Sequence, residues 1–291
     1  MCKKSIAALL AFLAHLGWIL TACQGGPVAV PRSPLVTPLA ESPNTTRKVT
    51  DVQRVEMVFV PAGEFSMGSQ GGDADERPIH SVYLDKYYID MYEVTNARYR
   101  ACVEAGACLP PFQEGSFTRG RYYNDPSFDD FPVMYVSWEM AQAYCAWRGV
   151  ELPSEAQWEK AARGTDARTY PWGEGIDCQR ANYYHQEGAD FEACAGDTTR
   201  VGSYISGQSP YGAFDMTGNV WEWVADWYSD SYYHESPLRN PLGPESGRMR
   251  VVRGGAWQFS DYTLRAANRY WFNPANALEN VGFRCAQEAG P

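Results

Sequence analysis

The stretch Gly218-Asn219-Val220-Trp221-Glu222-Trp223 decides how this chain folds, together with Arg253-Gly254-Gly255-Ala256-Trp257. The Gly-Asn pair indicates a turn, and large aromatic side chains recur after it at every second position, as in a strand with one aromatic face. The second stretch ends a strand in two glycines, where the backbone must approach another group closely. The two stretches therefore predict β-structure around a core rich in tryptophan.

The N-terminus carries an export signal. Met1-Cys2-Lys3-Lys4 is a short basic segment, and the apolar run from Ser5 to Leu20 is too short for an ordinary membrane-spanning helix. The run ends in Leu20-Thr21-Ala22-Cys23, which resembles a bacterial lipobox, so we expect a signal peptide over 1–22 and lipid on Cys23. The alternative is a plain secretory signal that is also cleaved near residue 22. Both predict an extracytoplasmic protein, and lipidation would anchor it to a membrane.

The segment after the signal differs in composition from the rest of the chain. Residues 23–54 combine the lipidated cysteine with a proline-rich stretch that has too little apolar surface to offset the entropy of ordering. We therefore expect a disordered tether there, one folded domain over 55–287 and a short tail at 288–291. No internal repeat and no second domain boundary is evident.

Charge and composition limit the partners of the domain. Hydrophobic residues make up 45% of the sequence, which is enough for a sizeable core. The formal net charge of −10 argues against nucleic acid as a partner, because phosphate binding needs clustered lysine and arginine. The same acidity suits cation binding, or serves only solubility.

Local signals predict short strands and three helices. Two strands are expected around a Pro-Ala-Gly turn within 57–68, and another strand over 81–89. The expected helices run from Thr95 to about Ala105, from Trp138 to Trp147 after the cap Ser137, and from the capping box of Ser154 and Gln157 to near Gly164. Glycine, proline, asparagine and aspartate recur through the remainder, which favours an irregular α+β domain with little regular secondary structure.

Several short motifs follow one another in a fixed order. They include Phe65-Ser66-Met67-Gly68, Tyr92-Glu93-Val94-Thr95-Asn96, Ala143-Tyr144-Cys145, Glu151-Leu152-Pro153-Ser154, Gly218 to Trp223, Arg253-Gly254-Gly255 and Gly282-Phe283-Arg284-Cys285. In number and order they resemble the formylglycine-generating enzyme (sulfatase-modifying factor) family. The resemblance covers roughly residues 55 to 287. It implies that family's compact α+β fold, which is related to C-type-lectin-like folds.

Six cysteines remain once Cys2 has left with the signal and Cys23 has been lipidated. An even number in an oxidising compartment predicts three disulfides. The alternative is a metal site, but the chain has no C-x-x-C and no histidine at ligand spacing from a cysteine pair. The resemblance implies a bond between Cys145 and Cys285. With that pairing taken from the family, the local pairs Cys102–Cys108 and Cys178–Cys194 remain.

The resemblance also implies structural calcium. One family site maps onto the side chains of Asp215 and Glu222 and the carbonyls of Gly218 and Val220, which are the hard oxygen ligands that Ca²⁺ takes. The alternative from the residues alone is that Asp215 caps a turn and Glu222 pairs with an arginine. A second family site begins at the positions of Asn182 and Tyr183, with Asp197 as a candidate for its later acidic ligand.

The resemblance fails where the family's chemistry takes place. Those oxidases convert a cysteine of an unfolded sulfatase to formylglycine with oxygen and with copper held by two cysteines, and soft thiolates are what select Cu(I). Here Phe259 stands about where the first copper cysteine belongs, and the second has no counterpart. The usual serine is Ala256. We therefore expect no copper and a degenerate catalytic site.

The favoured function is a non-catalytic binding or accessory module with a peptide, protein or glycan ligand in the cell envelope. Rigid aromatic side chains suit such contacts, and the candidate groove residues are Trp221, Trp257, Tyr262, Tyr270 and Trp271. A core position is favoured for Trp221, and Tyr270 to Pro274, expected as a polar loop, is the best exposed candidate. The alternatives are a divergent oxidase acting on a sulfatase or another protein cysteine, and a structural envelope protein.

Overall fold

The computed structural model describes residues 48–187 and 190–290, without the side chains of 186–191. The predicted signal peptide, Cys23 and most of the predicted tether lie outside these residues. One part of that tether lies inside them, because β1 (Lys48–Thr50) pairs antiparallel with β2 (Glu56–Val60). The folded part therefore begins before the predicted boundary at residue 55. Within the described ranges, no helix has the length and apolar character needed to cross a membrane.

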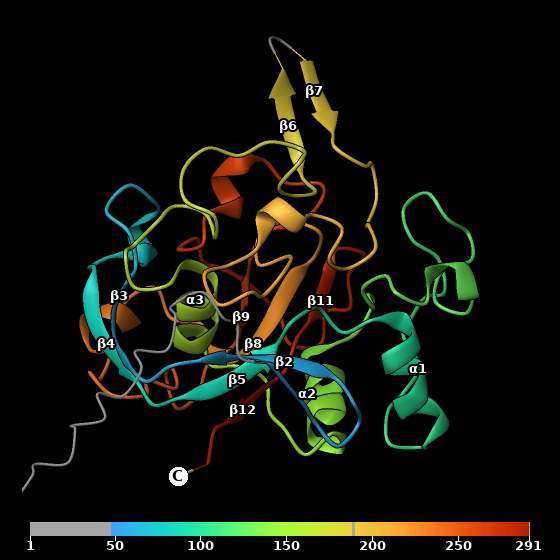
Figure 1. Cartoon of the computed structure of the whole chain (residues 1–291), viewed down its shortest axis with the longest axis horizontal. Helices are drawn as coiled ribbons and strands as arrows, with labels where there is room; N and C mark the ends of the chain where they lie inside the picture. The colour runs from blue at the N-terminus through green and yellow to red at the C-terminus, as the bar shows by residue number, and fades with distance from the viewer. Residues whose placement is uncertain (1–47, 188–189, 291) are drawn as a thin grey trace, which may run out of the picture. The chain divides into compact units, whose positions relative to one another are not determined.

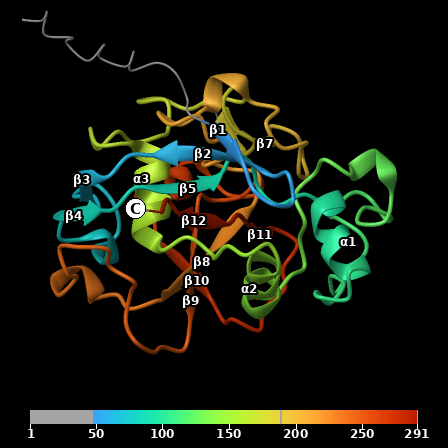
Figure 2. The ribbon, with the colours of Figure 1, turned by 60° about the horizontal axis from the view of Figure 1, so that its bottom comes forward.

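Two four-stranded sheets organise the domain. The first has the strand order β1-β2-β5-β12 and is antiparallel throughout. Its third strand is β5 (Tyr87–Asp90), and its last strand is β12 (Ala286–Glu288), which comes from the far end of the chain. Figure 2 shows β2, β5 and β12 running side by side. The predicted tail therefore starts within a strand.

The second sheet contains the stretch that decides the fold. Its order is β10-β9-β8-β11, and β8 (Trp221–Trp227) pairs parallel with β11 (Val281–Phe283) and antiparallel with β9 (Arg250–Arg253). The edge strand β10 (Tyr270–Phe272) pairs with β9. The predicted alternation in β8 is correct, but both of its faces are buried: Trp221 and Trp223 belong to one apolar cluster and Val224 to another.

The three helices form where the sequence predicts them. They are α1 (Asn96–Glu104), α2 (Trp138–Trp147) and α3 (Glu155–Arg163). Thr95 and Ser137 accept the capping hydrogen bonds of the first two helices, and Ser154 and Gln157 form the capping box of the third. These elements are predictable because capping depends on a few neighbouring residues.

The predicted strand over 81–89 is wrong in one respect, because the chain forms two strands there. β4 (His80–Leu84) pairs with β3 (Gly63–Met67), whereas β5 joins the first sheet. A hairpin of β6 (Tyr184–Glu187) and β7 (Asp190–Ala193) projects from the rest of the domain (Figure 1). Short 3-10 helices occupy Ala74–Glu76, Pro126–Phe128, Ile205–Gly207, Tyr232–His234 and Asp261–Leu264.

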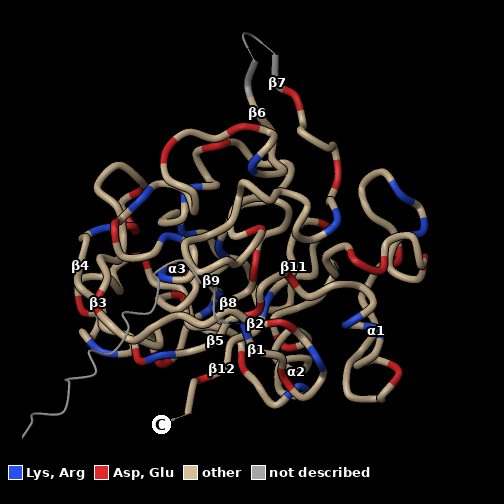
Figure 3. The backbone as a smooth tube through the Cα atoms, in the orientation of Figure 1, with Lys and Arg blue, Asp and Glu red and all other residues tan. Residues whose placement is uncertain are grey.

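Positively and negatively charged residues are interspersed along the chain (Figure 3), and several of their side chains are buried. Arg253 of β9 lies between two carboxylates of α3, 3.0 Å from Glu155 and 2.5 Å from Glu159. Arg269, just before β10, is 2.7 Å from the same Glu155. All of these side chains are almost fully buried, so their charges are compensated by one another rather than by water.

The glycines of the two deciding stretches allow close approach, as predicted. Gly218 and Gly255 have φ angles of 80° and 74°, a region that side chains other than glycine rarely adopt. A Cβ on Gly218 would collide with the carbonyl of Asn182, and one on Gly255 would collide with the side chain of Leu264. The turns at the ends of β8 and β9 therefore require glycine.

Candidate functional site

The segment in which the resemblance implies a degenerate copper site packs into an apolar cluster. Ala256 is fully buried, and its carbonyl accepts a hydrogen bond from the Phe259 amide at 2.9 Å. The half-buried Phe259 ring meets Trp221 edge to face at a centroid distance of 5.5 Å. Neither residue offers an electron pair to a soft metal ion.

All six cysteines of the described part of the chain are in disulfides. The three bonds are Cys102–Cys108, Cys145–Cys285 and Cys178–Cys194, which confirms the predicted pairing. The second closes a loop with a sequence separation of 140, and both of its cysteines are fully buried. No thiol of the described residues is free in this state to replace the missing copper ligands.

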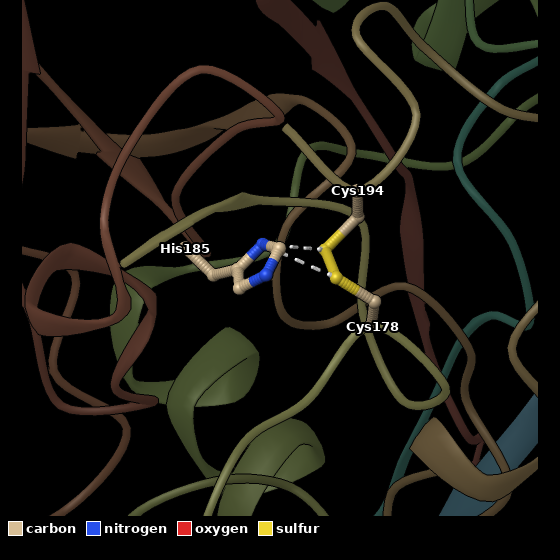
Figure 4. A group of neighbouring side chains, drawn as sticks. All are labelled: Cys178, His185 and Cys194. Carbon is tan, nitrogen blue, oxygen red and sulfur yellow. Dashed lines mark hydrogen bonds between the residues drawn. A yellow bond between two sulfur atoms is a disulfide. The ribbon is translucent and has the colours of Figure 1, made fainter. Parts of the chain in front are cut away.

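Although no histidine stands at ligand spacing from a cysteine pair in the sequence, the fold places His185 beside one. The Nδ1 atom of His185 is 3.4 Å from the Cys178 sulfur and 3.9 Å from the Cys194 sulfur (Figure 4). Pairing of β6 with β7 sets Tyr184 opposite Ala193 and His185 opposite Glu192, so the hairpin brings the imidazole to the disulfide. Residue spacing alone did not reveal this contact, because it depends on the register of the hairpin.

Glu222, a predicted calcium ligand, is engaged in a buried ion pair. Arg284 lies 2.6 Å from each of its carboxylate oxygens, and the indole N–H of Trp158 donates to the same group at 2.8 Å. The alternative left open by the sequence, that Glu222 pairs with an arginine, therefore describes this residue correctly. The Asp215 carboxylate accepts a hydrogen bond from the Gly202 amide at 2.6 Å.

A third carboxylate, Glu93, lies in the motif from Tyr92 to Asn96, but nothing in the sequence marks it as a site residue. It is buried and accepts hydrogen bonds from the Asn219 side chain and the Val220 amide at 2.6 and 3.2 Å. Burial, together with the nearby Asp215 and Glu222 carboxylates, raises the pKa of Glu93 well above its usual value. Burial likewise raises the pKa of Asp215 to about 6. This region thus holds three buried carboxyl groups, of which only Glu222 is paired with Arg284.

The second predicted calcium position also has a buried oxygen without a partner. The Asn182 amide donates to the Asp197 carbonyl at 2.8 Å, while its Oδ1 accepts no hydrogen bond from any described residue. The Asp197 carboxylate accepts hydrogen bonds from Ser116 and Thr118 and lies 3.2 Å from Arg119. The unpaired Asn182 oxygen and the buried carboxyl groups both fit a hard cation.

The structure divides the predicted groove residues into two groups. Trp221 and Trp257 are buried, whereas Tyr262, Tyr270 and Trp271 are 44%, 39% and 40% exposed. The segment from Tyr270, expected as a polar loop, begins with strand β10. The two groups touch, because the rings of Trp221 and Tyr270 stack at 5.5 Å.

We call the set Tyr228, Tyr262, Tyr270 and Trp271 the aromatic surface; Tyr228 is half-buried and the other three side chains are exposed. Trp271 contacts the rings of Tyr270 and Tyr228 at centroid distances of 6.0 and 5.6 Å. The hydroxyls of Tyr228 and Tyr262 donate to Asp75 and Asp73, both at 2.8 Å. These bonds fix the rings on either side of the segment around the 3-10 helix Ala74–Glu76.

Comparison with known proteins shows the family. Residues 42–289 match the sulfatase-modifying factor enzyme 1-like domain. The chain is 35% identical to the formylglycine-generating enzyme of Streptomyces coelicolor, over 80% of this chain and 89% of that protein. It is 37% identical to the serine/threonine-protein kinase Pkn1 of Chlamydia trachomatis, over 88% of this chain but only 43% of the kinase.

A comparison with solved structures agrees with this family membership. The structure superposes on PvdO from Pseudomonas aeruginosa with a TM-score of 0.70 and 28% identity, covering 84% of this chain and 98% of that one. The predicted fold class, an irregular α+β fold of the formylglycine-generating kind, is confirmed. Because the family model matches most of the chain, this protein belongs to the family of sulfatase-modifying factor enzyme 1-like domains.

Proposed function

We propose that this protein is a non-catalytic member of its family that binds an extended segment of a partner protein outside the cytoplasm. The observation that carries the proposal is the packing of Phe259 against Trp221 where the oxidases of the family hold copper. Formylglycine formation needs two thiolates at that place, and the described cysteines are all in disulfides. What remains on the scaffold is a surface suited to binding.

The aromatic surface is the part of the molecule best suited to a ligand. Tyr270 and Trp271 lie on β10, the edge strand of its sheet, and an edge strand presents backbone groups to which an extended peptide can add as a further strand. Tyrosine and tryptophan at such an edge supply large contact area at little cost in side-chain entropy. The net charge of −10 favours a neutral or basic peptide over an acidic one.

Calcium would stabilise the domain rather than take part in chemistry. The unpaired Oδ1 of Asn182 supports Ca²⁺ at the second position implied by the family resemblance. The buried Asp215, with Glu93 as a further carboxylate beside it, supports Ca²⁺ at the first. Because both Glu222 oxygens already accept hydrogen bonds from Arg284, Glu222 would have to share its carboxylate to act as a ligand. Bound Ca²⁺ would offset negative charge that burial makes costly.

The N-terminal sequence and the disulfides support a location in the cell envelope. The lipobox-like segment before Cys23 supports an anchored lipoprotein, and three disulfides suit an oxidising compartment. If Cys23 is lipidated, palmitate should label the wild-type protein but not a Cys23→Ala variant. Unchanged labelling of that variant would argue against lipid on Cys23.

Peptide binding is tested by selecting displayed peptides on the full-length protein and measuring the affinity of the selected sequences. We expect Trp271→Ala and Tyr270→Ala to weaken binding by about tenfold or more, as for aromatic residues central to an interface. Ile205→Ala is the matched control, because Ile205 is 76% exposed but does not belong to the aromatic surface. Equal affinity in all four proteins would contradict the proposal, as would selective binding of glycans without peptide binding.

A further inference from the structure

Cys178, His185 and Cys194 form a side-chain cluster with the chemistry of a metal site. Their ligand atoms, two sulfurs and Nδ1, all lie within 4.8 Å of one another. Figure 4 shows the imidazole facing the bond between the two sulfurs. The ring of Tyr183 lies 5.8 Å from that of His185 and supports it from one side. In the oxidised state the sulfurs bond to each other and offer no thiolate.

This disulfide is more accessible to a reductant than the other two. Cys178 and Cys194 are both half-buried, whereas Cys145, Cys285 and Cys102 are completely buried. Thiol–disulfide exchange begins with attack of an external thiolate on one sulfur, so its rate depends on access. An external dithiol should therefore open Cys178–Cys194 before it opens the other two bonds.

We propose that Cys178, Cys194 and His185 form a binding site for a thiophilic d¹⁰ cation, Zn²⁺ or Cu⁺, that is created when this disulfide is reduced. A dithiol reductant transfers two electrons and two protons to the disulfide, which becomes two thiols, while the reductant becomes a disulfide. Binding of the cation then releases both thiol protons, because the ligands are thiolates. The neutral imidazole supplies a third ligand, and water completes the coordination of Zn²⁺.

The surroundings of Cys178 and Cys194 allow the metal site to form without unfolding of the domain. The two cysteines pack beside a small apolar cluster that includes Tyr170, Tyr183 and Leu264. The Cys194 amide donates to the Tyr183 carbonyl at 2.9 Å, and the Tyr184 amide donates to the Phe259 carbonyl at 3.0 Å. These backbone bonds hold the segments that carry Cys194 and His185 in place when the bond between the sulfurs is broken. The separation of the sulfurs can then increase to suit a metal ion.

The test uses the full-length protein before and after mild treatment with dithiothreitol, which is then removed without oxygen. Alkylation and mass spectrometry identify the opened disulfide. Co²⁺ serves as an optical probe through its thiolate charge-transfer absorption, Zn²⁺ is quantified by displacement of Co²⁺, and Cu⁺ by competition with a chromogenic chelator. We expect one equivalent of cation per reduced protein, none for the untreated protein, and alkylation confined to Cys178 and Cys194.

Two variants and one control separate this site from non-specific binding. Cys178→Ser/Cys194→Ser should abolish the thiolate absorption, while Cys102→Ser/Cys108→Ser, which removes another disulfide, should leave it unchanged after reduction. His185→Ala should retain both thiols but lower Zn²⁺ affinity at least tenfold, about the smallest loss seen even for residues that support a ligand. The proposal is overturned if the untreated protein binds equally well, if His185→Ala changes nothing, or if another disulfide opens first.

Discussion

Phe259 and Glu222 show how single residues change what a shared scaffold can do. Phe259 lies in a tight turn and packs against Trp221, so it is part of the structure rather than an isolated loss of a cysteine. The sequence predicted the missing ligand from its position in a motif. It left open the partner of Glu222, because Arg284 is 62 residues away along the chain and only the pairing of β8 with β11 brings the two together.

The buried Asp226 should make the stability of the protein depend on pH. Burial, assisted by the nearby Glu155 carboxylate, raises the pKa of Asp226 from its usual 3.8 to about 7. The folded protein therefore binds a proton there that the unfolded chain releases near pH 4. The contribution of Asp226 to the free energy of unfolding is therefore largest below pH 4. It decreases by up to roughly 4 kcal/mol as the pH rises to about 7.

Urea unfolding between pH 4 and 8 tests this expectation. Asp226→Asn keeps an oxygen to accept the Glu155 amide, which Asp226 binds at 2.7 Å, but it removes the ionisation. The variant should therefore be more stable than the wild-type protein above pH 7 and similar to it at pH 4. Asp130→Asn, at an exposed position, should follow the wild-type profile. If the free energy of unfolding of Asp226→Asn changes with pH as it does in the wild-type protein, Asp226 is not the responsible group.

Helix α3 shows what could and could not be predicted for an element. Its start and end follow from Ser154, Gln157 and Gly164, which are close in sequence. Its role in the fold does not, because Glu155 and Glu159 bind Arg253 from almost a hundred residues later. For the same reason the sequence located β3, β4 and β5 only approximately and assigned no partners, since strand pairing is set by packing between distant segments.

The buried network between α3 and β9 should contribute strongly to stability. Arg253→Leu leaves Glu155 and Glu159 buried with one cation fewer, and breaking a buried ion pair in this way costs roughly 3–5 kcal/mol. We expect a loss near the lower limit, because Arg269 and Arg163 still contact the two carboxylates. Arg200→Leu, which breaks an exposed pair with Asp130, should cost less than about 1 kcal/mol. Chemical denaturation measures both losses. If Arg253→Leu and Arg200→Leu lower the free energy of unfolding by similar amounts, the buried network does not stabilise the fold.

For the molecule as a whole, the family, the fold class and all three disulfides were predictable from the sequence. Motif order carries that information even where each motif alone is weak. The cluster of Cys178, His185 and Cys194 was not predictable, because it arises from a hairpin register. The aromatic surface was predicted in part: Tyr262, Tyr270 and Trp271 are exposed, but nothing in the sequence indicated that Trp257 is buried.

Calcium should act on the stability of the whole domain. A cation that binds only the native state adds roughly 2.7 kcal/mol at a hundredfold excess over its Kd. We therefore expect a chelator to lower the melting temperature and added Ca²⁺, but not Mg²⁺, to restore it. Asp215→Ala and Asn182→Ala should each reduce this response, while Asp130→Ala should not. A melting curve that is the same with chelator and with Ca²⁺ would remove calcium from the account.

We predict that this member of the family has no formylglycine-generating activity. The experiment incubates the full-length protein with copper, oxygen, reductant and a cysteine-containing sulfatase peptide, and then measures the mass of the peptide. Phe259→Cys provides a second sample, because one thiolate still leaves Cu⁺ under-coordinated. We predict an unchanged peptide cysteine with both proteins. Conversion of that cysteine to the aldehyde by the wild-type protein would contradict the claim.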